Sequence, residues 1–304
     1  MTKIITDTDI AVNELINGGI IALPTETVYG LCANALNPEA VIKIYEVKHR
    51  PRFNPIIVHV KDVSEFEKYA QDIPEVVYRL AEKFSPGPIS YVLKKKNIIP
   101  DIVTAGNNSV ALRVPAHELF KKVLDDSGIP VCAPSANIFT SISPVSALDV
   151  LKELGDKINY ILDGGKCKIG IESTVVSFIE GEINILRHGF ITKEEIEKVT
   201  GKISYKKSDK FVSPGMMKVH YAPGTPMYFV NSFDEVKKIK NKKVGLLDFS
   251  KYKDNREIAL NLFSDLRNLD EKNLDLIVCK RADDTGLGVA INERLEKAAR
   301  GKLP

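Results

Sequence analysis

The densest group of reactive side chains near the start of the chain is the segment Leu23-Pro24-Thr25-Glu26-Thr27-Val28-Tyr29-Gly30-Leu31. Two hydroxyls, a carboxylate and a phenol lie within these nine residues, directly after an apolar segment at 20–23 that reads as a buried strand. Open α/β sheets bind ligands where their strands end, so this segment is a candidate ligand loop. An ordinary loop at a strand end is the alternative.

A second group is cationic and covers Lys48-His49-Arg50-Pro51-Arg52-Phe53-Asn54-Pro55, with three permanent charges in five residues. The helix dipole alone favours cations at a helix C-terminus, which is the structural interpretation. The two prolines stiffen the segment, however, and would hold Lys48 and Arg50 where a polyphosphate could use them.

Two further segments place small polar side chains after apolar strands. Ala133-Pro134-Ser135-Ala136-Asn137 suits the close approach of a ligand, or forms a helix cap or turn. Leu162-Asp163-Gly164-Gly165 predicts a tight turn, and Glu172-Ser173-Thr174 opens a strand. Neither segment has a phosphate-binding glycine motif, so ATP bound here would be held by side-chain cations and hydroxyls.

A last segment, Pro214-Gly215-Met216-Met217-Lys218-Val219-His220-Tyr221-Ala222-Pro223-Gly224, sets Met, His and Tyr between two Pro-Gly turns. It is either a linker packed on the first domain or a lid over the site.

The elements that must position these groups alternate between strands and helices over residues 1–200. Helix starts are predicted at Asp7, at Asn37-Pro38, at Ser143-Pro144 and at the capping box Thr192–Glu195. Apolar strands are predicted at 20–23, 55–60, 89–93, 109–114, 129–133, 160–162, 173–178 and 183–187. This mixture predicts an α/β domain built on a mixed sheet.

Residues 226–304 predict a small second α/β domain. Short apolar strands at 227–230, 244–249 and 274–279 are separated and followed by helical segments near 232–240, 255–271 and 290–300. That order indicates a small, Rossmann-like parallel sheet. Residues 201–225, rich in Lys, Ser, Gly and Pro, are predicted to be a linker or lid between the two domains.

Composition limits the classes of function. The net charge of +3 gives no support for strong overall attraction to nucleic acid, although a local basic cleft is compatible with it. The four cysteines are spread without a C-x-x-C pair, so we expect buried thiols in a reducing compartment and no zinc site. Without a signal-peptide core or a membrane-spanning run, the sequence predicts a cytoplasmic protein that does not contact membranes.

Together these segments resemble the YrdC-type threonylcarbamoyl-AMP synthase family, in its long form with a C-terminal domain, over residues 7–300. The matching motifs are LPTETVYGL at 23–31, Lys48-x-Arg50, Ser85–Pro88, Ala111–Pro115, Ser135-x-Asn137, Gly170–Val176, His220–Gly224 and Gly288–Leu295. The family usually has a Ser-Gly pair where this chain has Phe139-Thr140, so the loop up to Ser143 is expected to differ.

The resemblance implies a twisted mixed sheet with a basic cleft and an adenylation reaction. L-Threonine, bicarbonate and ATP would give threonylcarbamoyl-AMP and pyrophosphate, for threonylcarbamoyl modification of adenosine in tRNA. Mg²⁺ would arrive with ATP without a metal site in the protein. A tRNA-modifying transferase complex would receive the product, and a weak RNA contact is compatible with the basic cleft.

The resemblance also implies roles for individual residues. Lys48 and Arg50 would be catalytic. Threonine would be bound by Thr27, His59, Arg113, Ala133 and Ser173. ATP would be bound by Lys48, Arg50, Asn54, Ser109, Ser135, Asn137, Ser143, Arg187 and Tyr221. Without the resemblance, His59 would be read as a satisfied core residue, because a lone histidine in an apolar strand usually is one.

Two alternatives stay open on the sequence alone. The first is an RNA-binding module with the same basic face and no adenylation activity, which the low net charge and the lack of an exposed aromatic series argue against. The second is a carbamoyl-transfer or nucleotide-hydrolysing enzyme of similar fold, which would consume ATP without threonine.

Overall fold

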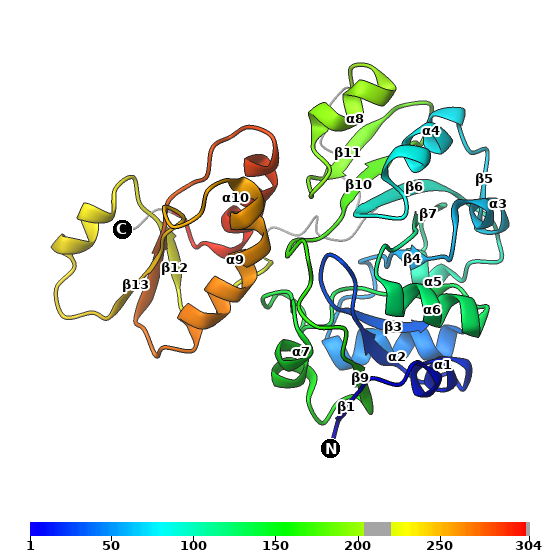
Figure 1. The fold of residues 1–304 in the computed structure, drawn as a ribbon, viewed down its shortest axis with the longest axis horizontal. Helices are drawn as coiled ribbons and strands as arrows, with labels where there is room; N and C mark the ends of the chain where they lie inside the picture. Colours follow the sequence, from blue (N-terminus) through cyan, green and yellow to red (C-terminus); the bar gives the residue numbers. More distant parts are fainter. Residues whose placement is uncertain (204–219, 302–304) are drawn as a thin grey trace.

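The computed structural model describes residues 1–203 and 220–301, so most of the predicted linker at 201–225 lies outside the described residues. A large α/β body is built from the first 200 residues, and a smaller one follows it (Figure 1). The helix α8 (Lys193–Thr200) ends the first body, and β12 (Met227–Phe229) opens the second.

The large body is organised around one mixed sheet of eleven strands, in the order β1-β9-β2-β3-β8-β4-β7-β6-β10-β11, with β5 paired to β6. β2 and β3 are antiparallel, whereas β4 with β7 and β6 with β10 are parallel. This confirms the predicted mixed sheet. The strands are β1 (Lys3–Ile5), β2 (Ile21–Leu23), β3 (Gly30–Asn34), β4 (Val58–His59), β5 (Ala70–Gln71), β6 (Ile89–Lys95), β7 (Ser109–Arg113), β8 (Val131–Cys132), β9 (Tyr160–Leu162), β10 (Thr174–Ser177) and β11 (Asn184–Arg187).

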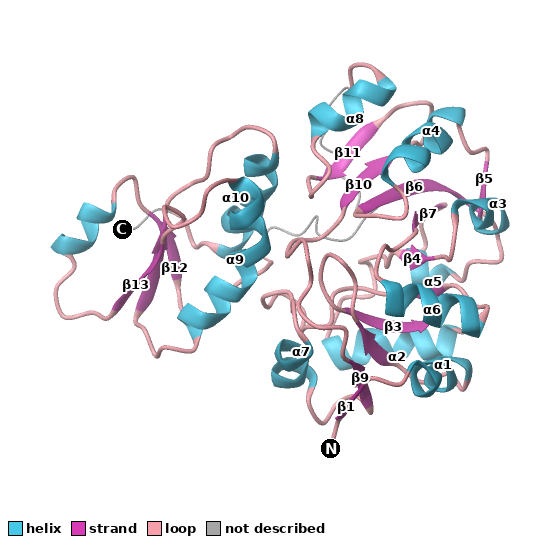
Figure 2. Ribbon diagram, in the orientation of Figure 1, coloured by secondary structure: helices cyan, strands magenta, loops and turns pink. Residues whose placement is uncertain are grey.

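Helices pack on both faces of this sheet (Figure 2). They are α1 (Thr8–Ile16), α2 (Pro38–Lys48), the 3₁₀ turn η1 (Val63–Glu65), α3 (Phe66–Tyr69), α4 (Glu75–Phe84), α5 (Asp101–Thr104), α6 (Glu118–Ser127), α7 (Ala147–Leu154) and α8.

Three of the predicted helix starts are confirmed by their capping bonds. Asp7 accepts from Asp9 N, Asn37 accepts from the amides of Glu39 and Ala40, and Thr192 forms a reciprocal capping box with Glu195. These caps satisfy amides that have no partner within the helix.

The predicted helix start at Ser143-Pro144 is wrong. α7 is capped instead by Ser146, whose side chain accepts from Asp149 N. Ser143 lies three residues before this cap, and its hydroxyl donates to the carboxylate of Glu172, 2.6 Å away.

Several strands differ from prediction. The strands β1, β3 and β5 were not predicted, and β4 covers only Val58–His59 instead of 55–60. β3 has the sequence GLCAN, which carries no β-branched residue, and its place is set by pairing with β2 and β8. The extents of β3 and β4 are therefore set by pairing with strands that are distant in sequence.

The second body is a three-stranded parallel sheet in the order β12-β14-β13, which confirms the predicted architecture. Its elements are β12, the 3₁₀ helix η2 (Phe233–Lys238), β13 (Val244–Leu247), α9 (Asn255–Asp270), β14 (Leu276–Cys279) and α10 (Leu287–Ala298). Both helices lie on the side of this sheet that faces the large body (Figure 2). The helix predicted near 290–300 is α10, which begins three residues earlier, after Gly286.

Among the described residues, no helix combines the length and the apolar character that crossing a bilayer requires. All four cysteines are buried and unpaired, as the sequence predicted.

Candidate functional site

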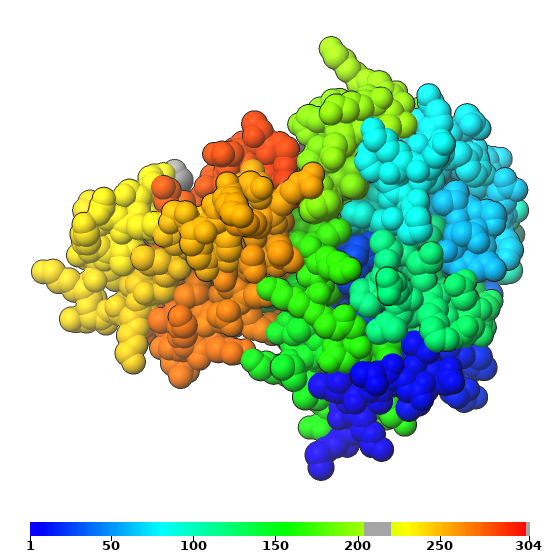
Figure 3. Space-filling model, in the orientation of Figure 1, coloured from blue at the N-terminus to red at the C-terminus, as the bar shows by residue number. Residues whose placement is uncertain are grey.

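A cavity of about 50 Å³ lies where β2, β4, β7 and β8 end, β10 begins and the second body approaches. The two bodies pack against each other next to this region (Figure 3). Eight of the predicted site residues line the cavity: Thr27, Arg50, His59, Arg113, Ala133, Ser135, Arg187 and Tyr221. It is also lined by Thr25, Val28, Gly30, Ile57, Pro134, Glu172 and His220.

Arg113 is the best-anchored cation of the cavity wall. It ends β7, and its guanidinium donates from Nη2 to Glu26 Oε1 at 2.6 Å and to Thr27 Oγ1 at 3.1 Å. Its Nε donates to the carbonyl of Gly87 at 3.3 Å. Glu26 is held in turn by the amide of Ala116, at 3.2 Å. The arginine therefore keeps one orientation in the cavity, which suits it to recognise a carboxylate.

The loop at 23–31 is shaped by its own side chains. Thr25 donates to the carbonyl of Val28 at 2.6 Å and accepts from the amides of Thr27 and Val28. Tyr29 points away from the cavity and donates to the carbonyl of Gly165 at 2.8 Å, which anchors the predicted Gly164-Gly165 turn. Thr25 and Tyr29 hold the loop, while Thr27 faces the ligand space.

His59 sits in the middle of this wall, at the end of β4. It is buried, packs its ring 5.1 Å from that of Phe120, and its Nδ1 finds no hydrogen-bond partner among the described residues. Burial, with the nearby charge of Arg113, lowers the pKa of His59 to about 3. His59 therefore lines the cavity as a buried, neutral imidazole.

Arg50 is delivered to the cavity by the end of α2, where His49 adopts a left-handed conformation (φ +52°) that turns the chain. Its Nε and Nη2 donate to the carbonyls of Asn54 and Pro55, at 3.2 and 2.8 Å. The guanidinium lies 5.9 Å from the ring of Phe139, in the loop that was expected to differ from the resembled family. Burial lowers the pKa of Arg50 to about 10, so it stays charged at neutral pH.

Lys48 lies behind the wall rather than in it. Its ammonium donates to the carbonyls of Ser135, at 2.5 Å, and Asn137. Burial, with the charge of Arg50, lowers the pKa of Lys48 well below its ordinary value. These contacts hold the 135–137 loop in place, which is a positioning role for Lys48.

Arg187 lines the opposite wall of the cavity, and Ser173 lies behind it. Arg187 donates from Nη2 to Ser173 Oγ and from Nε to the carbonyl of Ser173, both at 3.0 Å. The hydroxyl of Ser173 also lies 2.9 Å from that of Ser90. Ser173 is thus one bond behind a cation that lines the cavity.

The remaining predicted residues are placed less directly. Ser143 and Asn137 stand behind the wall, with Asn137 Nδ2 donating to the carbonyls of Ile138 and Ser141. Asn54 is buried behind Arg50, and neither of its side-chain polar atoms has a partner among the described residues. Ser109 is not brought to the cavity: it begins β7, four residues from Arg113, and lines a separate surface pocket with Lys94 and Gly181.

Glu172, His220 and Arg294 belong to the site and were not singled out from the sequence. Glu172 lines the cavity, accepts from Ser143 and pairs with Arg294 Nε at 3.0 Å. Burial opposes its ionisation, but the charges of Arg294 and Arg187 and the Ser143 hydrogen bond outweigh it and lower the pKa of Glu172. In the sequence, the only indication for Glu172, His220 and Arg294 was that each lies in a motif shared with the resembled family, at 170–176, 220–224 and 288–295 respectively.

The described end of the predicted lid, His220-Tyr221, closes the cavity on the side of the second body. The two rings lie 4.1 Å apart, and Tyr221 stacks on Phe263 of α9 at 5.4 Å. Burial lowers the pKa of His220 to about 3 and raises that of Tyr221, so both are neutral at pH 7. Residues 204–219 of the lid lie outside the described residues.

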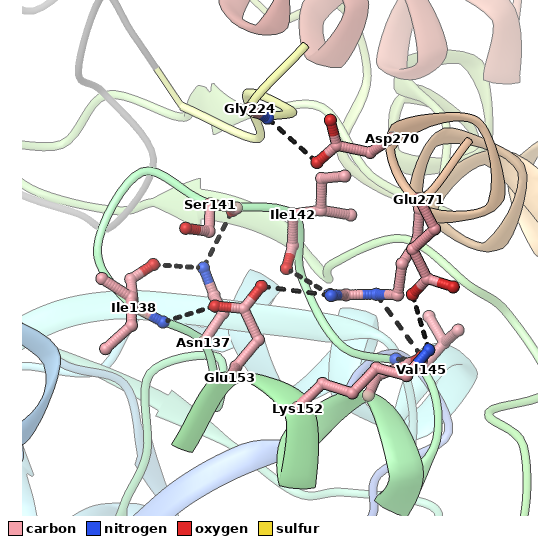
Figure 4. A network of polar contacts seen from close by, with 12 residues as sticks. Asn137, Ile138, Ser141, Ile142, Val145, Lys152, Glu153, Gly224, Asp270 and Glu271 are labelled. Atoms are coloured by element: carbon pink, nitrogen blue, oxygen red, sulfur yellow. Dashed lines mark hydrogen bonds and ion pairs between the residues drawn. The ribbon is translucent and has the colours of Figure 1, made fainter. Parts of the chain in front are cut away.

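A polar network joins the second body to the loop that carries Ser135, Asn137 and Ser143 (Figure 4). Arg267 of α9 donates to Glu153 at 3.1 Å and to the carbonyl of Ile142 at 3.0 Å. Lys152 pairs with Glu271 at 2.5 Å on the same side. The position of this loop therefore depends on both bodies.

Comparison with known proteins agrees with this two-body site. Residues 13–189 match the Sua5/YciO/YrdC family model, described as "Telomere recombination". Residues 191–300 match the model described as "Threonylcarbamoyl-AMP synthase, C-terminal domain". Threonylcarbamoyl-AMP synthase of Pyrococcus abyssi is 40% identical over 95% of this chain and 93% of its own, and that of Bacillus subtilis is 39% identical over 93% and 90%.

A solved structure shows the same arrangement. The crystal structure of P. abyssi Sua5 complexed with L-threonine superposes with a TM-score of 0.92 at 39% identity, covering 97% of this chain and 95% of that one. The relatives' names are those of nucleotidyltransferase-type enzymes. The chain therefore belongs to the threonylcarbamoyl-AMP synthase family, in the form that carries both the Sua5/YciO/YrdC domain and the C-terminal domain.

Proposed function

We propose that this protein joins L-threonine, bicarbonate and ATP into threonylcarbamoyl-AMP and releases pyrophosphate. The observation that carries the proposal is one cavity with two anion-binding walls. Arg113 with Thr27 and His59 suits an amino acid, while Arg50 and Arg187 suit phosphates. Support also comes from the P. abyssi relative, whose structure was solved with L-threonine.

In this proposal Arg113 binds the threonine carboxylate, while Thr27 and His59 orient the amine and the hydroxyl. Ser173 acts through Arg187, which it holds from behind. His59 fits this task because it is neutral at pH 7 and its Nδ1 has no partner among the described residues. A neutral imidazole nitrogen accepts a hydrogen bond from an amine without adding charge to the site.

Bicarbonate gives carbon dioxide and hydroxide, and the neutral amine of threonine adds to the carbon dioxide. The proton that the amine loses joins the hydroxide as water, which leaves a carbamate. A carbamate oxygen then attacks the α-phosphorus of ATP, and the bond to pyrophosphate breaks. This sequence requires no protein nucleophile, so the residues contribute by positioning and by stabilising charge. Arg50 and Arg187 offset the negative charge that grows on the phosphates, and Lys48 holds the 135–137 loop beside them.

We propose that Mg²⁺ enters as a complex with ATP, held by phosphate oxygens and water. The carboxylates nearest the substrates are already committed, Glu26 to Arg113 and Glu172 to Arg294 and Ser143. Across the described ranges, no group of three His, Cys, Asp or Glu is arranged to hold a metal. When bound, the ion would neutralise phosphate charge during the transfer.

The product is a labile mixed anhydride, so we propose that a tRNA-modifying transferase complex consumes it directly, with weak RNA contact at the basic cleft. The four unpaired, buried thiols support a reducing compartment, and we propose the cytoplasm. Filter binding of tRNA at rising salt tests the RNA contact, which should be weak and should fall steeply with salt.

Pyrophosphate release with each substrate omitted in turn tests the proposal. Release should require ATP, threonine and bicarbonate together. ATP consumption without threonine would indicate a carbamoyl-transfer or hydrolytic enzyme instead. Tight tRNA binding without any pyrophosphate would indicate the RNA-binding module, which the family relationship does not support.

A further inference from the structure

Arg294 is the most deeply buried cation contributed by the second domain, with 1% of its surface exposed. It projects from α10 into the first domain and donates from Nε to Glu172 Oε2 at 3.0 Å. Its Nη1 donates to the carbonyl of His188 at 2.7 Å and, within its own helix, to that of Ala290 at 2.9 Å. Burying a guanidinium charge costs desolvation free energy, which its hydrogen-bond partners must offset. The role of Arg294 therefore follows from those partners.

The principal partner, Glu172, is part of the cavity wall. One of its carboxylate oxygens receives Arg294, and the other accepts from Ser143 Oγ at 2.6 Å. Without Arg294, a buried carboxylate would stand next to the place where the triphosphate must bind, and like charges at that range repel. Arg294 neutralises this carboxylate and fixes the direction in which it holds Ser143.

A second arginine of the same domain holds the neighbouring residue. Arg267 donates to the carbonyl of Ile142 at 3.0 Å, immediately before Ser143. The C-terminal domain therefore fixes the chain at Ile142 directly and at Ser143 through Glu172. Next to Arg294, Glu293 accepts from the amide of His188 at 3.2 Å, which fixes the same face of α10 on the first domain.

We propose that Arg294 is a positioning residue of the adenylation site, acting through Glu172 and Ser143, so that the C-terminal domain completes the nucleotide half of the cavity. The proposal rests on the proposed function for the identity of the anionic substrate. It assigns Arg294 to ATP and not to threonine, because the Arg113 wall has its own anchors, Glu26 and Gly87.

The test uses the full chain with Arg294→Met, Arg294→Lys and the double variant Arg294→Met/Glu172→Gln. The matched control is Arg281→Met, since Arg281 pairs with Glu296 at 2.5 Å on the exposed surface of the same domain. ATP and threonine affinities are measured separately by calorimetry, KM and kcat by pyrophosphate release, and folding by urea denaturation.

Arg294→Met should raise the ATP Kd and the ATP KM about tenfold or more, with the threonine Kd changed less than about threefold. The double variant Arg294→Met/Glu172→Gln should recover ATP affinity, because it no longer has an unpaired carboxylate. At least half of the loss in binding free energy caused by Arg294→Met should be restored. Arg294→Lys should fall between Arg294→Met and the wild type, and Arg281→Met should match the wild type.

A folded Arg294→Met protein with unchanged ATP affinity would overturn the proposal, as would an equal loss of threonine affinity or a double variant no better than the single one. If Arg294→Met does not fold, the same comparison is made with Arg294→Lys, where unchanged ATP affinity is again the contrary result. The wild-type protein separates failure of this proposal from failure of the proposed function. If the proposed function is wrong, the wild type itself will show no threonine-dependent release of pyrophosphate.

Discussion

Glu26 and Arg113 form a buried ion pair in the wall of the cavity, with 2.6 Å between Glu26 Oε1 and Arg113 Nη2. The pair joins the loop that follows β2 to the end of β7, so a carboxylate near the start of the chain orients a cation 87 residues later. Because Glu26 also accepts from the amide of Ala116, it fixes the position of Arg113 in the part of the cavity that is proposed to bind threonine.

Glu26→Ala should destabilise the protein by about 3–5 kcal/mol, because it leaves the guanidinium of Arg113 buried without its counter-charge. Glu26→Gln should lose less, since the amide oxygen still accepts from Nη2. Urea denaturation measures both. The exposed Glu82→Ala on α4 is the matched control and should stay within about 0.5 kcal/mol of the wild type. Equal stability of Glu26→Ala and the control would contradict the assignment.

Arg113→Lys should raise the threonine KM by about two orders of magnitude while the ATP KM changes little. A lysine has no planar guanidinium fork. It therefore cannot make the two oriented hydrogen bonds to Glu26 and Thr27 and also contact a substrate carboxylate. Steady-state pyrophosphate release with either substrate varied makes the comparison. A larger effect on ATP than on threonine would reverse the assignment of the two walls.

Lys48→Ala and Arg50→Ala should each cut turnover by orders of magnitude in a protein that remains folded, for two different reasons. Arg50 lines the cavity in which the phosphates are proposed to bind, whereas Lys48 holds the carbonyls of Ser135 and Asn137. Lys43→Ala on the same helix, whose ammonium donates to the carbonyl of Gly18, is the control. Near-normal pyrophosphate release by either site variant would refute its role.

His59 should make stability depend on pH. Its pKa falls from 6.5 to about 3 on folding, so between these values the unfolded chain binds a proton that the folded chain does not. Stability is therefore lost as the pH falls through 6.5 toward 3, by about 2 kcal/mol from this group at about pH 5. His59→Gln should reduce the loss between pH 7 and pH 5 in urea denaturation. Identical losses in both proteins would show that His59 is not buried neutral.

Much of the local structure was predictable because its causes are local. Asn37 and Pro38 define the start of α2, and the cationic segment after that helix was expected to hold Arg50 near a ligand. The strand ends that carry His59, Arg113 and Ala133 were recognisable as apolar runs, and the structure brings all three to one cavity.

What escaped prediction depends on contacts between residues that are far apart in the chain. Glu172 and Arg294 are separated by 122 positions, and no local pattern in either segment indicates that they meet. Ser143 was predicted to cap a helix because Ser-Pro is a good local start signal, but Ser146 caps α7 and the hydroxyl of Ser143 donates to the distant Glu172. Lys48 was expected among the phosphates, and only the fold shows that the 135–137 loop surrounds its ammonium.

The most direct test of the account is a single-turnover reaction with ¹³C-bicarbonate, ATP and L-threonine, analysed by mass spectrometry. We predict an adenylate that carries the ¹³C label and the mass of threonylcarbamoyl-AMP, formed in equal amount to pyrophosphate. Pyrophosphate or ADP appearing without that labelled adenylate would contradict the account.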